Sequence, residues 1–509
     1  MAQFKILNFQ MLNPPPAMND LTFAFRQLRL GFLCCLDLGV WCRGIWCFVL
    51  SPGLRLESPR PPLTPTMIMN RKTNASETVP TISRFRAAAL LAAASCLLSA
   101  SDTTYGQAAP PTFEAYLRRS VVDQKTLDVF LDPKQLSWAK FDPITGYRLG
   151  NYMPNDGLDR SSTISTSQSN GMRTARAYVN QPCRINAYGD SFTLCHQVSD
   201  SETWEEYLAG HLGEPIRNFG MGGFGVYQAY RRMIREEQTD HGARYLIFYI
   251  WGDDHVRSLL RCRHAAIYPW WNDDGGRAFH NNFWANVEMN LQTGQLEEHE
   301  NLLPTPESVY KMTEPDWTVQ ALKDDLALNM FLYARGNVGD LDMSGVRKLA
   351  AHLGFDRSGL EDAQPQRAVI GELLDRYSFA ATKVILTKAK AFSDQNGKRL
   401  LVVLFDPSRV VRPLVEGKAR YDQAIVDFLR DHQFRYFDMN LVHVEDYQNF
   451  RIPFDQYLKR YFIGHYSPAG NHFFAYAIKD TIIDWLDPKP ITYLKQDDRW
   501  IKFDGYLSK

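Results

Sequence analysis

A serine directly follows a short apolar run, in the sequence Gly189-Asp190-Ser191-Phe192. The run, residues 184–188, is typical of a buried strand, and ligands of open α/β sheets bind outside the carboxyl ends of such strands. A hydroxyl at that edge is open to a substrate carbonyl, and its own backbone N–H can donate to an oxygen that becomes negatively charged. Ser191 is therefore a candidate nucleophile, and Asp190 is expected to hydrogen-bond the backbone of the turn.

Two further predicted strands end in residues suited to the same edge. Residues 218–225, Asn-Phe-Gly-Met-Gly-Gly-Phe-Gly, form a glycine-rich turn whose backbone N–H groups can come close to a bound acyl group. The apolar run 245–250 ends in Trp-Gly followed by Asp253, Asp254 and His255. Consecutive residues on an extended segment point to opposite faces, so a metal site made of these three side chains is not favoured.

A histidine near the C-terminal end of the chain can act as a general base. It stands in the sequence Gly-His465-Tyr-Ser467-Pro468, where Ser467 can cap a helix and Pro468 can begin it. An imidazole at a helix entry beside the sheet edge can take the proton of a serine hydroxyl, which is the chemistry of acyl transfer.

These four blocks, in this order and spacing, resemble the GDSL or SGNH hydrolase superfamily, in particular its exported bacterial members. The resemblance covers residues 180–260 and 395–490. It implies a three-layer α/β/α, flavodoxin-like fold with a parallel sheet, and ester hydrolysis through an acyl-enzyme without a cofactor or metal. It carries Ser191 over as the nucleophile and His465 as the catalytic histidine. The oxyanion donors it implies are the backbone N–H groups of Ser191 and Gly223.

One departure from this pattern concerns the oxyanion site. Asp253 stands where the superfamily offers asparagine, and an ionised carboxylate cannot donate to a developing oxyanion. Either Asp253 is protonated or another donor replaces it, with His255 and Arg257 the nearest candidates. Asp190 and Asp254 complete the set of supporting residues.

The second departure concerns the acid that orients the histidine. The superfamily carries aspartate two or three residues before it, where this chain has Ile463 and Phe462. In a serine protease, loss of that function costs about four orders of magnitude in turnover. A backbone carbonyl could orient the imidazole, giving a Ser-His dyad, or Asp455 or Asp406 could reach in from another loop. These alternatives stay open.

The elements that must position these residues are apolar runs alternating with helical stretches, which favour a parallel sheet covered by helices on both faces. The predicted strands are 184–188, 216–219, 245–250, 399–405 and 434–439. The predicted helices are 203–212, 226–236, 378–396, 421–432 and 468–486. The stretch between the third and fourth strands is too long for one crossover, so it is expected to be an insertion with a hairpin, 287–291 with 295–298, and a helix, 321–333.

The hydrolase domain is accordingly assigned to residues 181–257 and 378–490, interrupted by the insertion 258–377. An N-terminal extension, 109–180, precedes it and a tail, 491–509, follows. Residues 1–108 are assigned to a leader, because two arginines precede an Ala- and Leu-rich run and a small-residue cleavage site, as in a secretory signal spanning 69–108. A lipoprotein signal at Cys96 and a short buried helix at 87–100 are the alternatives. Residues 1–66 are interpreted as an over-extended gene start, with a long leader as the other reading.

Composition limits the partners. The 57 basic and 57 acidic residues give zero formal charge, which argues against binding nucleic acid by bulk electrostatics. The apolar stretch 30–50 contains Asp37 and Arg43, so no membrane span is expected there. Only Cys183, Cys195 and Cys262 follow the leader, and a pair between the first and last is an open alternative.

These observations predict an exported, periplasmic or secreted, serine esterase. Its expected partner is a small-molecule or glycan ester with a short acyl group, acetyl on carbohydrate being one candidate. A glycan O-acyltransferase using the same Ser-His pair and a catalytically silent glycan-binding protein are the alternatives. Trp270, Trp271 and Trp284 could form an aromatic platform for a sugar, although aromatic residues in a long insertion usually build its core.

Overall fold

The computed structural model describes residues 109–268, 275–362 and 365–494. The leader, Trp270, Trp271 and residues 495–509 of the predicted tail lie outside the described residues. In the described part no helix is both long enough and apolar enough to cross a membrane.

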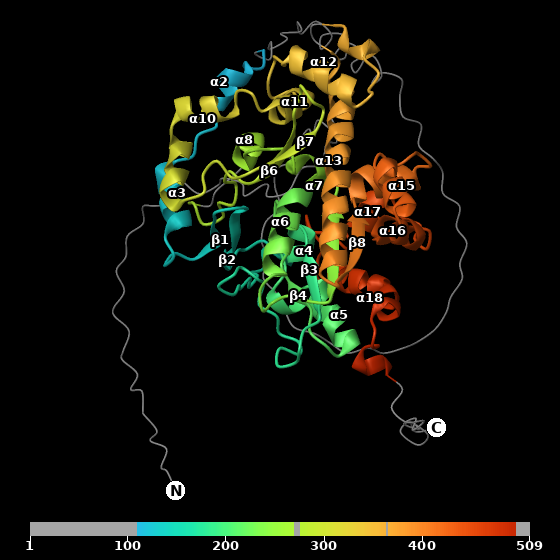
Figure 1. Ribbon diagram of the computed structural model, residues 1–509. Coiled ribbons are helices and arrows are strands. Elements are labelled where there is room, and N and C mark those ends of the chain that lie inside the picture. The colour runs from blue at the N-terminus through green and yellow to red at the C-terminus, as the bar shows by residue number, and fades with distance from the viewer. Residues whose placement is uncertain (1–108, 269–274, 363–364, 495–509) are drawn as a thin grey trace, which may run out of the picture.

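A five-stranded sheet lies at the centre of the molecule (Figure 1). All its neighbouring strands pair in parallel, in the order β4-β3-β5-β8-β9. The first strand of the sheet in chain order therefore lies between the second and the third, and the fourth and fifth follow. The bounds are β3, Ile185–Tyr188; β4, Arg217–Asn218; β5, Tyr245–Trp251; β8, Arg399–Phe405; and β9, Arg435–Asp438.

Helices cover both faces of the sheet, as the alternation of elements predicts. In β5, Phe248 belongs to one buried core, whereas Ile247 and Tyr249 belong to the core on the other face. The first face is covered by α6, Val226–Glu236; α13, Arg367–Gln395; and α15, Gln423–Asp431. The second is covered by α5, Trp204–Leu212; α16, Met439–Tyr447; and α18, Pro468–Trp485. The chain is thus an α/β protein with three layers around a parallel sheet.

The longest helix, α13, begins well before the predicted start at Ser378. Its first turns carry Ile370, Leu373, Leu374 and Tyr377, all buried at helical spacing. These side chains pack against the insertion, where α13 lies beside α11, Leu326–Ala334. One continuous helix therefore runs from the insertion into the layer that covers the sheet (Figure 1).

The predicted hairpin of the insertion is confirmed, because β6, Asn286–Met289, pairs antiparallel with β7, Leu296–His299. The predicted helix 321–333 is confirmed from Leu326 to Tyr333, which lie in α11, but its first residues belong to a separate helix, α10, Pro315–Leu322, with Asp325 between the two. The Asp325 carboxylate accepts from the N–H of Leu328 at 2.9 Å and so begins a new helix. The remaining helices here are α8, Arg263–Ile267; α9, Pro306–Val309; α10, Pro315–Leu322; and α12, Met343–His352.

The N-terminal extension contains more regular structure than its sequence indicates. Two short helices, α2, Phe113–Leu117, and α3, Gln124–Leu131, precede an antiparallel hairpin of β1, Ser137–Asp142, and β2, Gly146–Asn151. Trp138 and Tyr147 of this hairpin are buried, and the Tyr147 hydroxyl donates to the carbonyl of Gly222 at 3.1 Å. The extension therefore packs onto the glycine-rich turn that follows β4.

Trp284 does not belong to an exposed platform. Its side chain is fully buried, and its indole N–H donates to the carbonyl of Leu260 at 2.6 Å. Cys183, Cys195 and Cys262 are free thiols, so the alternative of a disulfide between the first and last is not realised.

Candidate active site

The turn after β3 presents Ser191 as the first residue of the short helix α4, Ser191–Leu194. Asp190 caps this helix, because its carboxylate accepts from the N–H of Phe192 at 2.9 Å. Gly189 is required by close packing, since a Cβ there would lie 2.3 Å from the Thr193 hydroxyl and 2.9 Å from the Tyr249 carbonyl. Asp190 thus holds the backbone of the turn, and Ser191 sits at the carboxyl edge of the sheet.

Ser191 and His465 are separated by 274 positions in the chain and meet in the structure. The Ser191 Oγ lies 2.7 Å from the His465 Nε2. His465 stands just before α18, whose first residue is Pro468 and whose cap is Ser467, accepting from the N–H of Gly470 at 3.2 Å. Only 9% of Ser191 and 5% of His465 are exposed, so the pair is nearly shielded from water.

Gln197 takes the place of the acid that orients the histidine. Its side-chain oxygen accepts from the His465 Nδ1 at 3.0 Å and from the backbone N–H of His465 at 2.8 Å. Its amide nitrogen donates to the carbonyls of Asp156, at 3.1 Å, and Ile463, at 3.2 Å. Because these carbonyls accept only from the amide nitrogen, the oxygen faces the imidazole. The hydrogen of the neutral ring then resides on Nδ1, and Nε2 is left to accept from the hydroxyl of Ser191.

The two carboxylates considered from the sequence for this role have other partners. Asp455 lies on α17, Phe454–Leu458, is exposed, and pairs with Arg412 at 2.5 Å. Asp406 follows β8 and accepts from the N–H groups of Ser408, at 2.9 Å, and Arg409, at 2.8 Å. The orienting group is therefore a neutral amide rather than either acid.

The glycine-rich turn is tightly covered. Gly223 has φ +80°, and a Cβ there would lie 2.5 Å from the guanidinium carbon of Arg263. A Cβ on Gly222 would lie 2.3 Å from the ring of Trp138. Only glycine fits at these positions, and a side chain from the insertion and another from the N-terminal extension pack directly on the turn.

The block after β5 separates into side chains with different roles. The Asp253 carboxylate lies 3.6 Å from the guanidinium of Arg335. The Asp254 carboxylate accepts from the N–H of Trp251 at 2.9 Å and from Arg257 at 3.0 Å. An ion-paired carboxylate has no proton to donate, so Asp253 does not supply the donor that an oxyanion needs.

His255 is not the replacement donor considered from the sequence. Its Nδ1 pairs with the Thr382 hydroxyl at 2.9 Å and its ring packs edge-on against Phe379, both on α13. Burial lowers the pKa of His255 to about 3, so the ring is neutral. Among the described residues no group of three or more His, Cys, Asp or Glu side chains could hold a metal ion.

Burial and nearby charges set the protonation states around the pair. Burial, reinforced by the charges of His196 and Arg257, lowers the pKa of His465 well below its ordinary value of 6.5. Burial raises the pKa of Asp190 to about 6, and burial beside Asp190 raises the pKa of Asp254 well above its ordinary range. His465 is consequently neutral, and able to accept a proton, at neutral and mildly acidic pH.

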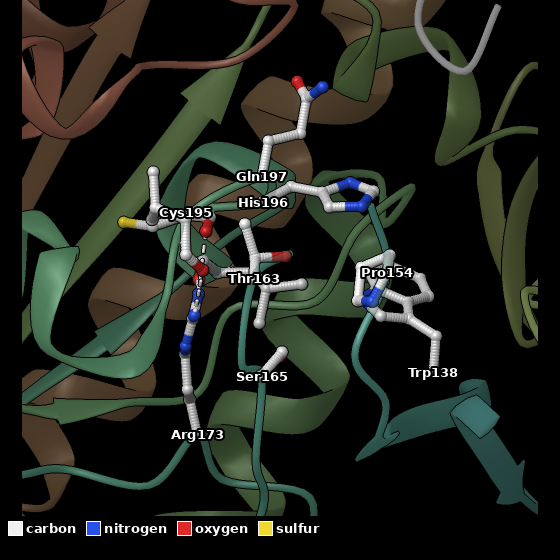
Figure 2. A pocket seen from close by; sticks show the side chains of 10 residues that line it. Trp138, Pro154, Thr163, Ser165, Arg173, Cys195, His196 and Gln197 are labelled. Atoms are coloured by element: carbon white, nitrogen blue, oxygen red, sulfur yellow. Dashed lines mark hydrogen bonds between the residues drawn. The ribbon is translucent and has the colours of Figure 1, made fainter. Parts of the chain in front are cut away.

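A second histidine lies behind the imidazole of His465. The His196 Nε2 lies 3.3 Å from the Asp156 carboxylate, and its ring stacks on Trp138 with 4.9 Å between centroids. Its ring centroid is 5.0 Å from that of His465. Figure 2 shows Trp138 and His196 side by side near Gln197.

Arg173 fastens the segment that carries His196 and Gln197. Its buried guanidinium donates to the carbonyls of Cys195, at 2.7 Å, and Val198, at 2.6 Å, and to that of Leu194. Figure 2 shows Arg173 beside Cys195. It also pairs with Asp200 at 3.2 Å. The N-terminal extension thus supplies the group that holds this loop in place.

Sequence reasoning missed five residues of the site: Asp156, Arg173, His196, Gln197 and Arg263. None stands in a motif, and only the folded arrangement brings them to the Ser191–His465 pair or to Gly223. The chain matches no known family model, and no curated protein matches it. Any inference about its chemistry therefore rests on the geometry of the site.

Proposed function

We propose that this protein is a serine esterase of the SGNH type that hydrolyses carboxylic esters through an acyl-enzyme. The observation that carries the proposal is the 2.7 Å contact between Ser191 Oγ and His465 Nε2. Gln197 supports it, because its oxygen holds the imidazole in the tautomer that leaves Nε2 free to accept a proton.

The chemistry follows from these positions. As the Ser191 Oγ bonds to the ester carbonyl carbon, its proton passes to His465 Nε2 and the carbonyl oxygen becomes an anion. The Ser191 and Gly223 backbone N–H groups are the proposed donors to that anion. Collapse of the intermediate breaks the bond to the leaving alkoxide, which receives the proton from His465. Water then attacks the acyl-enzyme with His465 as base, and the free acid and Ser191 are released.

The sheet order supports the finer assignment of the fold. The order second, first, third, fourth, fifth is the one known from flavodoxin-like sheets, in which ligands bind where the chain reverses direction between the first and third strands. Ser191 follows β3 and Asp253 follows β5, and these strands are neighbours in the sheet. The proposed active site therefore lies at the topological switch point.

A glycan O-acyltransferase is the second candidate, and one observation favours it. The nucleophile and the base are both nearly buried, which limits the access of water to an acyl-enzyme. The transferase would use the same residues and replace water by an acceptor hydroxyl. In either case we propose a short acyl group on a carbohydrate as the substrate and an exported protein as the setting.

The test compares the full chain with Ser191→Ala, using p-nitrophenyl acetate and acetylated polysaccharides as substrates. Ser201→Ala, an exposed serine nearby in the chain, is the matched control. We expect turnover in the wild type and in the control, and none above background in Ser191→Ala. Acetyl transfer to an added sugar that exceeds hydrolysis would select the transferase. Glycan binding without any turnover in the wild type would refute both candidates and favour a silent binding protein.

A further inference from the structure

A small cavity is lined by Asp253, one of the three positions to which the sequence assigns oxyanion donors. Its charged lining consists of Asp253, Arg257 and Arg263, with Phe331 among the apolar residues around them. Arg263 also packs on Gly223, as the 2.5 Å approach of its guanidinium carbon to a Cβ at that glycine shows. Arg263 is thus next to the glycine donor and lines the same cavity as Asp253.

The guanidinium of Arg263 is held in position by a hydrogen bond at one nitrogen, while another nitrogen still has an N–H to donate. Its Nη1 donates to the side-chain oxygen of Asn281 at 2.6 Å, and Asn281 is completely buried. Its Nε is buried and, within the described part of the chain, has no hydrogen-bond partner. A buried donor without a partner is unfavourable, so an oxygen arriving beside Gly223 would meet an N–H available for it.

The other two charged residues of the cavity fit the role less well. Asp253 is an acceptor that pairs with Arg335, and a carboxylate would repel a negative oxygen. Arg257 donates to the carboxylate of Asp254 at 3.0 Å. Arg263, by contrast, has its guanidinium in direct contact with Gly223.

We propose that Arg263 is a charged oxyanion donor, replacing the side-chain amide that Asp253 cannot provide; this inference rests on the proposed esterase function. When the Ser191 Oγ bonds to the carbonyl carbon, the electron pair of the carbonyl π bond moves to the oxygen, and an Arg263 N–H donates to it. The guanidinium keeps its proton throughout. When the carbonyl re-forms, the bond to the leaving alkoxide breaks and the contact weakens.

The experiment uses Arg263→Ala and Arg263→Lys in the full chain with the neutral substrate p-nitrophenyl acetate. Arg347→Ala, which removes an exposed arginine on α12, is the matched control. Because the donor acts on charge that develops in the transition state, we expect kcat to fall about 10²- to 10³-fold in Arg263→Ala while KM is unchanged. The smaller loss is expected in Arg263→Lys, which keeps the charge.

Chemical rescue separates a donor from a merely structural arginine. Guanidinium chloride at concentrations that leave the melting temperature unchanged should restore part of the kcat of Arg263→Ala and none in Ser191→Ala. Retention of kcat in Arg263→Ala would overturn the proposal. So would a loss that parallels a fall in melting temperature and is not rescued. A wild type without esterase activity would instead refute the proposed function itself.

Discussion

Gln197 gives the proposed catalytic pair, Ser191 and His465, a neutral orienting group. Its amide fixes the imidazole tautomer through the Nδ1 contact at 3.0 Å, but it brings no negative charge to stabilise the imidazolium that forms when His465 accepts a proton. Arg257 adds positive charge nearby. His465 is therefore a weak base. Its proposed catalysis depends on the exact position of the imidazole and on the proposed N–H donors to the oxyanion.

Replacing Gln197 tests this role. In Gln197→Met the ring and the backbone N–H of His465 lose their acceptor, so we expect kcat to fall at least about 10²-fold while the fold is retained. Gln197→Glu keeps an acceptor and should retain more activity than Gln197→Met. Steady-state kinetics with p-nitrophenyl acetate, beside melting temperatures, provides the measurement. Equal activity of wild type and Gln197→Met would remove Gln197 from the mechanism.

The pH profile should report the lowered pKa of His465. Burial disfavours the imidazolium, so the base stays neutral as pH falls through 6.5, and the acid limb of kcat/KM is expected below that value. A carboxylate beside the ring favours the charged form, so Gln197→Glu should move the limb to higher pH. Profiles of both proteins between pH 4 and 9 would contradict this account if the wild-type limb lay at 6.5 or above.

The sequence predicts residues of the site where local chemistry marks them, and misses those that only tertiary contacts place. Ser191 lies in the turn that follows a strand, and His465 precedes a Ser-Pro helix start, so both stand out by position. Gln197 is a neutral residue in a loop, and nothing local separates it from any other glutamine. Its role depends on the carbonyls of Asp156 and Ile463, which come from distant parts of the chain.

At the scale of elements, the segment from Ser191 to Val198 works as one unit. Cys195 and Gln197 both have left-handed backbone conformations, with φ +57° and +70°, which L side chains rarely adopt. Such a conformation persists only where its surroundings hold it, and Arg173 binds three carbonyls of this segment. The hydrogen bonds from Arg173 to these carbonyls therefore keep Gln197 beside His465.

Removing the Arg173 guanidinium should lower both the free energy of unfolding and the turnover. Arg173→Met leaves buried carbonyls and the Asp200 carboxylate without their donor, so we expect a loss of about 3 to 5 kcal/mol in the free energy of unfolding and a lower kcat. Arg176→Met is the matched control, because Arg176 also pairs with Asp200, at 3.0 Å, but is half exposed. Urea unfolding and steady-state kinetics measure the two effects. Similar results for both variants would refute this role of Arg173.

The elements themselves differ in how far local pattern predicts them. Strand β8 has the bounds expected from its apolar run, and α6 matches its helical period, because both patterns are long and local. The hairpin of β1 and β2 was missed, since its register depends on packing against the glycine-rich turn through Tyr147. The early start of α13 likewise depends on α11, an element that the sequence places on the wrong boundaries.

At the scale of the whole molecule, the site draws on three stretches of chain. The core supplies Ser191, Gln197 and His465, the N-terminal extension supplies Arg173, and the insertion supplies Arg263. The N-terminal extension and the insertion are both part of the proposed site, because each has a side chain in contact with the segments that carry the proposed chemistry. Deleting either one should therefore disable the site as well as expose apolar surface.

Stability should depend on pH through a buried acid far from solvent. Glu205 is buried in α5, and burial raises its pKa from 4.5 to about 8. Between these values the folded chain keeps a proton that the unfolded chain has lost, so this group makes stability fall as pH rises, by about 1.4 kcal/mol per unit. Glu205→Gln should thus gain stability relative to wild type from pH 5 to pH 8.

Urea unfolding at pH 5 and pH 8 measures the difference. Glu307→Gln, which replaces an exposed glutamate on α9, should show no such trend. A stability difference between Glu205→Gln and wild type that is the same at both pH values would show that the carboxyl is ionised in the folded state.

Ser191 and Gln197 sit at the two ends of one short stretch and contact opposite nitrogens of the same ring. One short stretch therefore contacts the imidazole from both sides, and Arg173 and the carbonyl of Asp156 hold that stretch from other parts of the chain. Displacement of the loop before α18 would remove His465 and, with the carbonyl of Ile463, one of the two acceptors that hold the amide of Gln197. Isolated pieces containing either half should accordingly regain turnover only when they are recombined.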